Sequence, residues 1–569
     1  MEGNKDVIIG IDFGTSGIGF AYGFLDDRSN KIYTGHFNGQ GVNNKIPAEI
    51  ILDNDFKNVL AFGNECDSYI ASNNSNTYQH FKKIKMNLYN KTYKIKSNNQ
   101  LKEVDIEYII RLMLIEIKKK AFEEIKKIKP SLNNENCKYV ITVPAIWDFK
   151  SKQIMIDAAK NSGLFNEDDN EGTFFALEPE AASIYYNSDY VSYETTINLG
   201  LPFILCDMGS GTVDIIVQQK IKSENEIQFE ELYPPTGGND GSNRINELFI
   251  EKVIFKLFGK KSYDSMKKDF EKIYDDWIKF EKEIEHFKTT YQGQKNSFYS
   301  INCEIFQDYC NVNIDKIIKE YNETCPENWK IKIKRRWIID FPYYIIDDLM
   351  NEVLENVLGY IRKIKNSFNN KLKLFIFTGG ASLSGAMVNK IQKIDEITLN
   401  YVKSPNPESA ISIGSVKYAF NRNIISIRKA KYTIGMGQSD FWEEKYEGKG
   451  KKIIVNGNLL CDNLFCKFIT KGEKIPVNKI NKQYFFLDGP FMYIDLYRTE
   501  EENIIFFDEK NNNGELKAIK FGELFLEVEN YDPNNNEIIV EMRFGGTFVS
   551  VCVKYVKNNQ KIKSLFAYQ

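Results

Sequence analysis

Two segments far apart in the chain combine an aspartate, a glycine and hydroxyl side chains in the same order. In each segment an apolar run ends in an aspartate, Asp12 or Asp207, and a glycine follows two residues later, Gly14 or Gly209. Glycine lets backbone N–H groups approach a phosphate closely. A carboxylate can hold the water shell of Mg²⁺, which takes few direct protein ligands. The paired segments therefore predict a magnesium–phosphate site to which each segment contributes one half.

The residues around these aspartates complete two candidate phosphate loops. Their hydroxyl side chains can donate hydrogen bonds to phosphate oxygens. A single Asp-x-Gly-Ser/Thr pattern is weak evidence, but a second copy after a second apolar strand makes coincidence improbable. The alternative is two ordinary hairpins with glycine turns. The predicted phosphate-binding residues are Gly14, Thr15, Ser16, Gly209, Ser210, Gly211 and Thr212.

Other motifs for nucleotides, metals and nucleophilic catalysis are missing from the sequence. It contains no GxxxxGK[ST] and no GxGxxG after a predicted strand, which argues against P-loop and Rossmann sites. It also lacks HExxH, and its three histidines are His36, His80 and His286. A histidine-rich metal site and a Ser-His-Asp triad are therefore poorly supported.

Length and composition limit the class of protein. A chain of 569 residues is too long for one core, because single cores stop growing near about 250–300 residues. A net charge of −3 gives no electrostatic reason to expect nucleic acid as a partner. Nine cysteines without a CxxC pair are typical of reduced thiols. With no leader and no long apolar run, we expect a cytoplasmic protein without a membrane span.

The elements around the two loops alternate between strands and helices. Strand–turn–strand patterns are predicted over residues 7–24 and 202–219, further strands over 138–145 and 372–380, and helices over 103–130 and 149–162. This alternation predicts an α/β fold. From residue 431 the pattern changes to apolar–polar alternation with turn clusters such as DPNNN, which predicts a separate β-rich domain.

Seven motifs resemble those of the 70 kDa heat-shock chaperone ATPases and occur in the same order. They are IGIDFGTS, YVITVPAIWDFKSKQ, ALEPEAASIYY, LCDMGSGTVD, TGGNDGSNR, FTGGASLSG and NPESAISIG, within about residues 7–420. Within that family the chain is most similar to the divergent heat shock 70 kDa protein 12-like branch. The resemblance implies a two-lobed actin-like fold, built from duplicated ribonuclease H-like halves, that binds ATP or ADP with Mg²⁺.

The same resemblance sets the expected domain limits. Lobe I is expected over 1–198 with a peripheral subdomain at about 36–103, and lobe II over 199–422 with one at about 233–339. A linker at 423–430 would lead to the β-rich domain at 431–569, with no helical lid after it. We expect that domain to bind a polypeptide client or one specific protein partner.

The family's catalytic residues correspond to Glu178, Asp207, Thr212, Asp214 and Lys85. The resemblance implies that Asp12 and Asp207 hold Mg²⁺ through water and that Glu178 orders the metal shell and the attacking water. Thr212 would contact the γ-phosphate, and Asp214 would supply a third acidic group. Phosphoryl transfer to water needs a positioned water, a cation and Mg²⁺ on the phosphate oxygens. A weak ATPase is therefore implied.

Three parts of the resemblance are less complete. The phosphate-contacting lysine lies in HFKKIKMNLY, where Lys85 is the first choice and Lys83 the alternative. The nucleoside residues correspond to Gly238, Glu285, Lys288, Gly379, Gly380, Ala381 and Glu408, but Leu383 and Thr289 stand where the family has arginines. The coupling pair corresponds to Pro144 and Lys152, and Lys152 replaces an arginine that could bond bidentately.

Three functions are compatible with these features. The first is an ATP- and Mg²⁺-binding chaperone-like protein in which slow hydrolysis accompanies polypeptide binding. The second is an ATP-sensing adaptor or scaffold with negligible hydrolysis. The third is a small-molecule kinase of the same superfold, such as a sugar kinase, which would need an aspartate base in the cleft; Asp214 is the candidate.

Overall fold

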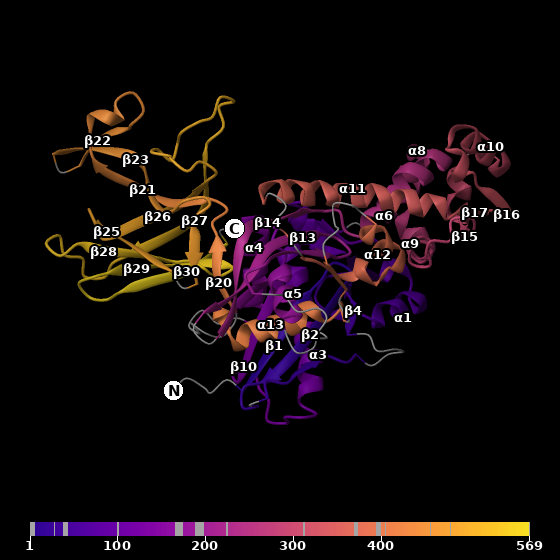
Figure 1. The fold of residues 1–569 in the computed structure, drawn as a ribbon, viewed down its shortest axis with the longest axis horizontal. Helices are drawn as coiled ribbons and strands as arrows, with labels where there is room; N and C mark the ends of the chain where they lie inside the picture. The colour runs from indigo at the N-terminus through magenta and orange to yellow at the C-terminus, as the bar shows by residue number, and fades with distance from the viewer. Residues whose placement is uncertain are drawn as a thin grey trace. The chain divides into compact units, whose positions relative to one another are not determined.

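The chain forms two compact units, each assembled from several segments (Figure 1). The first comprises Met1–Trp147, Ile154–Ile216 and Pro235–Asn421, and the second Asp148–Gln153, Val217–Pro234 and Arg422–Gln569. The computed structural model describes residues 6–27, 29–37, 44–99, 102–164, 174–187, 199–223, 226–310, 313–368, 372, 374–393, 400–403, 406–455, 457–477 and 479–567. Helices and strands alternate through the first unit, so the predicted α/β class is confirmed.

The first sheet contains the N-terminal glycine turn. Its strands are hydrogen-bonded in the order β11 (Phe174–Leu177), β10 (Cys137–Val143), β1 (Val7–Phe13), β2 (Gly17–Phe24) and β3 (Ile32–Thr34), and β4 (Lys45–Pro47) also pairs with β2. β1 is parallel to β10 and antiparallel to β2. Every residue of β1 is buried, as expected for an apolar strand that is covered on both faces.

A second sheet repeats this strand order. It runs β19 (Asn400–Lys403), β18 (Leu374–Thr378), β12 (Pro202–Met208), β13 (Val213–Ser223) and β14 (Glu226–Gly238). β12 is parallel to β18, and β18 is parallel to β19. A tight turn follows β1 in the first sheet and β12 in the second. Gly14 N–H donates to the Gly17 carbonyl at 3.0 Å after β1, and Gly209 N–H donates to the Thr212 carbonyl at 2.9 Å after β12. The sequence repeat is therefore also a repeat of sheet topology.

Two helices pack closely behind the first glycine turn. α5 (Glu178–Tyr186) follows β11 directly, and α13 (Ala410–Phe420) packs against α5, β1, β2 and β10 (Figure 1). A Cβ built on Gly414 of α13 would overlap the carbonyl oxygen of Ala181 in α5 and lie 2.5 Å from its carbonyl carbon. The helix backbones therefore touch at Gly414.

The remaining elements include two smaller parts of the first unit, and the helix over 149–161 begins in the second unit. One part is a three-stranded sheet in the order β6-β5-β7 with nearby helices, and another is mostly helical with a second three-stranded sheet in the order β15-β17-β16. Their bounds are β5 (Glu49–Asp53), β6 (Val59–Phe62), α1 (Glu65–Ser72), β7 (Tyr78–Lys82), α2 (Ile84–Tyr89), β8 (Lys94–Lys96), β9 (Glu103–Asp105), α3 (Ile106–Ile125), α4 (Phe149–Asn161), α6 (Asn243–Phe249), α7 (Phe255–Phe258), α8 (Lys260–Lys268), α9 (Phe270–Thr289), β15 (Phe298–Asn302), α10 (Ile314–Thr324), β16 (Lys332–Arg335), β17 (Ile338–Pro342), α11 (Tyr344–Ser367) and α12 (Gly385–Gln392).

The second unit is built around two antiparallel sheets. One is ordered β22 (Lys452–Val455), β23 (Asn458–Ile469), β21 (Thr433–Phe441), β26 (Phe491–Thr499) and β27 (Ala518–Glu527). The other is ordered β25 (Ile480–Phe486), β28 (Glu537–Arg543), β29 (Phe548–Tyr555) and β30 (Lys561–Ala567). Apolar residues from both sheets, such as Leu496 and Val540, form a common buried core. Part of the predicted linker forms β20 (Ile425–Lys429), which pairs with the 226–234 part of β14 and with β24 (Lys474–Pro476).

Candidate functional site

The two glycine turns lie against each other within the first unit. A Cβ built on Gly211 would lie 2.5 Å from Thr15 Oγ1 and would overlap Met86 Sδ. A side chain at position 211 would therefore displace the first turn. The structure thus brings the two predicted phosphate loops together, although their sequence positions differ by almost two hundred residues.

Four buried carboxylates surround these turns, at the positions predicted from the sequence. They are Asp12, Glu178, Asp207 and Asp214, each at most 4% exposed. Burial, together with the carboxylates of Asp214 and Asp12, raises the pKa of Asp207 to about 7. Burial also raises the pKa of Glu178 above its ordinary value, while Lys85 opposes that shift. So many acidic groups in one buried place are costly unless cations are bound there.

Two lysines supply positive charge inside this cluster. Lys85 Nζ lies 2.5 Å from Glu178 Oε1, and Lys45 Nζ lies 2.5 Å from Asp12 Oδ2. Of the two lysines left open by the sequence, Lys85 is therefore in the cluster, whereas Lys83 is half-exposed and lies 3.9 Å from Glu281. Sequence reasoning missed Lys45 because its place depends on the register of β4 against β2.

Asp214 contacts the segment that follows Pro144. Its Oδ1 accepts hydrogen bonds from the backbone N–H groups of Ala145 at 2.7 Å and Ile146 at 3.2 Å. Burial raises the pKa of Asp214, and Lys85 and the two backbone donors oppose that rise. Lys152, the other predicted coupling residue, is buried in the second unit.

A cavity of about 750 Å³ extends from the turns toward α9 and α12. Among the predicted site residues, Ser16, Ser210, Glu285, Lys288, Gly380 and Ala381 line it. Leu383 and Thr289, which stand where arginines were expected, line it too. Within the cavity wall, Lys288 Nζ donates to Glu285 Oε2 at 2.7 Å and to the Ser242 carbonyl at 3.2 Å.

The other predicted nucleoside residues are not among those that line the cavity. Gly379 lies against the buried carboxylates, because a Cβ there would overlap Asp207 Oδ1. Gly238 faces Tyr360 and Asp240, with Asp240 Oδ2 3.0 Å from a Cβ built on it. Glu408 is half-exposed, two residues before α13.

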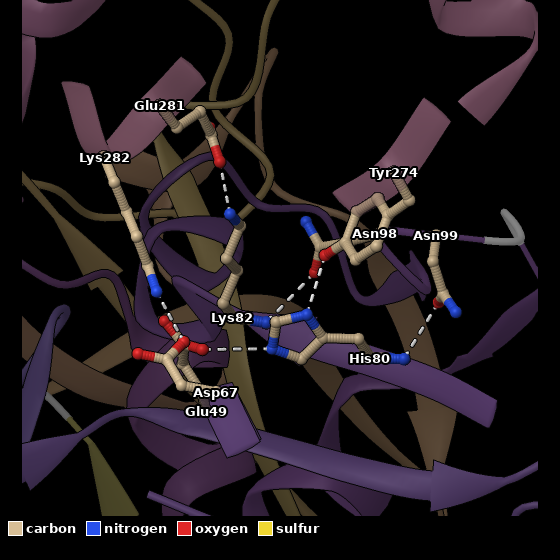
Figure 2. Close-up of polar contacts among 9 residues, drawn as sticks. All are labelled: Glu49, Asp67, His80, Lys82, Asn98, Asn99, Tyr274, Glu281 and Lys282. Atoms are coloured by element: carbon tan, nitrogen blue, oxygen red, sulfur yellow. Dashed lines mark hydrogen bonds and ion pairs between the residues drawn. The ribbon is translucent and has the colours of Figure 1, made fainter. Parts of the chain in front are cut away.

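Polar contacts join the β5–β7 sheet and α1 to helix α9 (Figure 2). We call this set of contacts the clasp; it consists of Glu49, Asp67, His80, Lys82, Tyr274, Glu281 and Lys282. His80 is buried and its two ring nitrogens lie 2.7 Å from Tyr274 OH and 3.1 Å from Glu49 Oε2. Lys82 pairs with Glu281, and Lys282 pairs with Asp67 at 2.7 Å. All but His80 and Tyr274 also line the cavity.

The cluster fits a hydrated cation better than a directly ligated one. No group of three or more His, Cys, Asp or Glu side chains in the described part of the chain is arranged to hold a metal ion. Asp207 Oδ1 is buried without a hydrogen-bond partner among the described residues. Mg²⁺ keeps several water ligands and is bound through few carboxylates together with substrate phosphates. Asp12 and Asp207 fit that role.

Comparisons with known proteins show which proteins this chain is similar to. Residues 198–393 match a family model described as a domain of unknown function (DUF8340). The chain is 23% identical over 629 residues to human heat shock 70 kDa protein 12A, covering 98% of this chain and 90% of that protein. It is 22% identical over 649 residues to human heat shock 70 kDa protein 12B, covering 99% and 91%. A chaperone protein DnaK of Carsonella ruddii (strain PV) is 25% identical over 301 residues, covering 52% of this chain and 43% of that protein.

The chain is similar to the 70 kDa heat-shock chaperones over part or nearly all of its length. The similarity to the two 12-type proteins extends over 98% and 99% of this chain, which supports a divergent branch like that of heat shock 70 kDa protein 12. None of the described helices is both long enough and apolar enough to cross a membrane.

Proposed function

We propose that this chain binds ATP or ADP with Mg²⁺ between the two lobes of an actin-like fold and links slow ATP hydrolysis to polypeptide binding, as a chaperone-like protein. The main support is the pair of glycine turns that face each other beside four buried carboxylates and Lys85. The two sheets have the same strand order, which supports a fold of two related lobes with one sheet in each. The cavity next to the turns is large enough for a nucleoside, since ligand pockets usually measure about 300–1,000 Å³.

Each group at the turns has a definable task in phosphoryl transfer to water. Lys85 supplies a point charge to the phosphate, and its contact with Glu178 fixes the position of that carboxylate. Glu178 Oε2 is then available to accept a hydrogen bond from the attacking water. Thr212 would donate to the γ-phosphate from the second turn in place of its present side-chain hydrogen bond to Asp214. Mg²⁺, held through water by Asp12 and Asp207, would neutralise charge on the β- and γ-phosphate oxygens.

Exposed aromatic side chains support polypeptide binding by the β-rich part, residues 431–569. On the two sheets of the second unit they occupy the outer faces of β25, β26 and β27. These side chains are Tyr484, Phe486, Phe491, Tyr493 and Phe525, each at least 45% exposed. Phe491 and Tyr493 of β26 contact the Phe525 ring of β27, whereas Tyr484 and Phe486 lie on β25 of the other sheet. Contiguous exposed apolar patches mark interaction sites on soluble proteins. Chaperones among the relatives make a polypeptide client the first choice.

An ATP-sensing adaptor with negligible hydrolysis is the second candidate. The observation that favours it is strand β20, since residues 425–429 of the predicted linker are hydrogen-bonded on both sides. A linker held within a sheet has little freedom to transmit a nucleotide-driven change. A sugar kinase is the least favoured candidate, because the carboxylate of Asp214 already accepts hydrogen bonds from two backbone N–H groups and from Thr212, which reduces its capacity to accept a substrate proton.

The proposal is tested by phosphate release from the full chain with and without an unfolded peptide. Turnover that the peptide stimulates supports the chaperone, and tight Mg·ATP binding without turnover supports the adaptor. Absence of any Mg·ATP or Mg·ADP binding in calorimetry would overturn both. Transfer of labelled phosphate to a sugar would support the function of a sugar kinase.

Glu178→Gln separates binding from chemistry. We expect it to change Mg·ADP affinity by less than about threefold and to slow single-turnover hydrolysis by about a hundredfold, the usual contribution of a positioned base or water-ordering group. Glu65→Gln is the control, because Glu65 lies on α1 with its side chain 63% exposed. Hydrolysis at the wild-type rate in Glu178→Gln would remove Glu178 from the mechanism.

Lys82→Glu tests whether the clasp holds the cavity closed. The substitution places two like charges together, because Lys82 pairs with Glu281 in the native protein. Because the two like charges would repel, we expect a fluorescent ADP to dissociate about tenfold faster in stopped flow. A tenfold change in rate corresponds to about 1.4 kcal/mol. The charge swap Lys82→Glu with Glu281→Lys should restore the rate, and Lys57→Glu, at a 75% exposed site, should not change it. An unchanged rate in Lys82→Glu would show that the clasp does not control release.

A further inference from the structure

Lys45 reaches Asp12 across an intervening glycine strand. In the register of the first sheet, Asp12 of β1 is opposite Gly19 of β2, and Gly19 is opposite Lys45 of β4. Residues directly opposite each other in antiparallel strands point to the same face. Asp12 and Lys45 are therefore on one face with only a glycine between them, and Lys45 Nζ closes the gap at 2.5 Å from Asp12 Oδ2.

The glycines of β2 make room for this lysine. A Cβ built on Gly19 would lie 3.0 Å from Lys45 Cγ, and one built on Gly17 would lie 3.3 Å from Lys45 Cβ and 3.5 Å from Cδ. The aliphatic stem thus lies flat on the backbone of β2, where larger residues would lift it away. The lysine position is built into the strand order and is not a chance surface contact.

The charges around Lys45 show what it does for the cluster. Asp207 and Glu178, besides Asp12, attract its ammonium group, and this attraction raises the pKa of Lys45 although burial lowers it. Fully ionised, the four carboxylates and the two lysines Lys45 and Lys85 sum to two negative charges. Without Lys45 the net charge of this cluster would be three negative charges. Lys45 therefore does part of the neutralisation that a divalent cation would do.

We propose that Lys45 is a built-in cation of the phosphate site, which competes with Mg²⁺ for Asp12 and allows a nucleoside diphosphate to bind without the metal. The proposal rests on the proposed function, because it takes the cluster to be a nucleotide-phosphate site. With Mg²⁺ absent, Lys45 keeps Asp12 neutralised and its ammonium group faces the phosphates. With Mg²⁺ present, the ammonium group leaves Asp12 and donates to a phosphate oxygen or to water.

The test is the ratio of ADP dissociation constants measured by calorimetry in EDTA and in excess Mg²⁺. In the wild type we expect binding in both conditions. In Lys45→Met we expect the ratio to increase at least about tenfold, the effect of losing one charge-assisted hydrogen bond. Lys45→Arg keeps the charge and should keep the ratio within about threefold. Lys31→Met is the matched control, since Lys31 is exposed and contacts the Tyr33 ring instead.

Each outcome decides a separate question. A ratio in Lys45→Met equal to that of the wild type would overturn the proposal while leaving nucleotide binding intact. Wild-type ADP binding that disappears in EDTA would overturn it as well, and needs no variant that has to fold. Absence of ADP binding in both conditions would instead overturn the proposed function.

Discussion

Replacing Asp207 by asparagine is expected to abolish the rise in melting temperature that Mg·ATP gives the wild type. A ligand at a hundred times its dissociation constant stabilises a protein by about 2.7 kcal/mol. Asp207 Oδ1 is buried without a hydrogen-bond partner among the described residues, so the loss of this carboxylate removes a group that would hold the metal's water. Differential scanning fluorimetry with and without Mg·ATP measures the effect. Asp55→Asn, at a 74% exposed site, is the control. If Mg·ATP raises the melting temperature of Asp207→Asn as much as that of the wild type, the metal lies elsewhere.

The ligand-free Asp207→Asn variant is expected to be more stable than the wild type above pH 7. Burial and the nearby carboxylates raise the pKa of Asp207 from 3.8 to about 7. Between these values the folded wild type keeps a proton that the unfolded chain has released, so its free energy of unfolding falls as pH rises. Asparagine has no such proton. The advantage of the variant should be absent near pH 4 and grow to about 1–4 kcal/mol above pH 7, as urea unfolding at several pH values would measure.

Replacing Gly414 by valine is expected to prevent stable folding. A Cβ at this position would overlap the carbonyl oxygen of Ala181, so helices α5 and α13 would have to separate. Both helices are buried, and α13 also packs on β1. Overpacking a core costs about 1–3 kcal/mol even where side chains can yield, and here the obstacle is backbone. We expect a loss above about 4 kcal/mol, seen as insoluble protein or as a lost thermal transition in circular dichroism.

Gly359 provides the matched control for this prediction. It lies within helix α11, and a Cβ built on it meets nothing within 4 Å. Gly359→Ala should therefore stabilise the protein by about 0.5–1 kcal/mol, the usual gain in a helix interior. A Gly414→Val variant that melts within about 2 °C of the wild type would show that the two helices are not in backbone contact.

The parts of the site that the sequence predicts are those carried by local patterns. An apolar run ending in aspartate, followed by glycine, defines both the strand and the turn, so Asp12 and Asp207 could be placed from a few neighbouring residues. Glu178 could be placed because ALEPEAASIYY matches a family motif at the start of a helix. None of these required knowledge of which strands pair.

The parts that the sequence did not predict depend on distant pairing. Lys45 reaches Asp12 only because β4 pairs with β2 in one particular register. His80 was considered only for metal binding or catalysis, yet it contacts Tyr274, 194 positions away. Similarly, motif order gave no distances, so it could not show that Glu408 lies outside the cavity wall while Leu383 lies in it. Local patterns describe elements, and register and packing decide which side chains meet.

Because the second unit is assembled from separate segments, it cannot be transferred into another protein as one continuous piece of chain. Strands β20 and β24 come from its last segment, the 226–234 part of β14 from an earlier one, and Phe149, which packs against its core, from the first. Residues 431–569 therefore contain both antiparallel sheets but not every segment of the second unit. Moved into another protein by themselves, they would lack β20 and leave one edge of β24 without its hydrogen-bonding neighbour. A transplant that keeps the architecture must carry the earlier segments along.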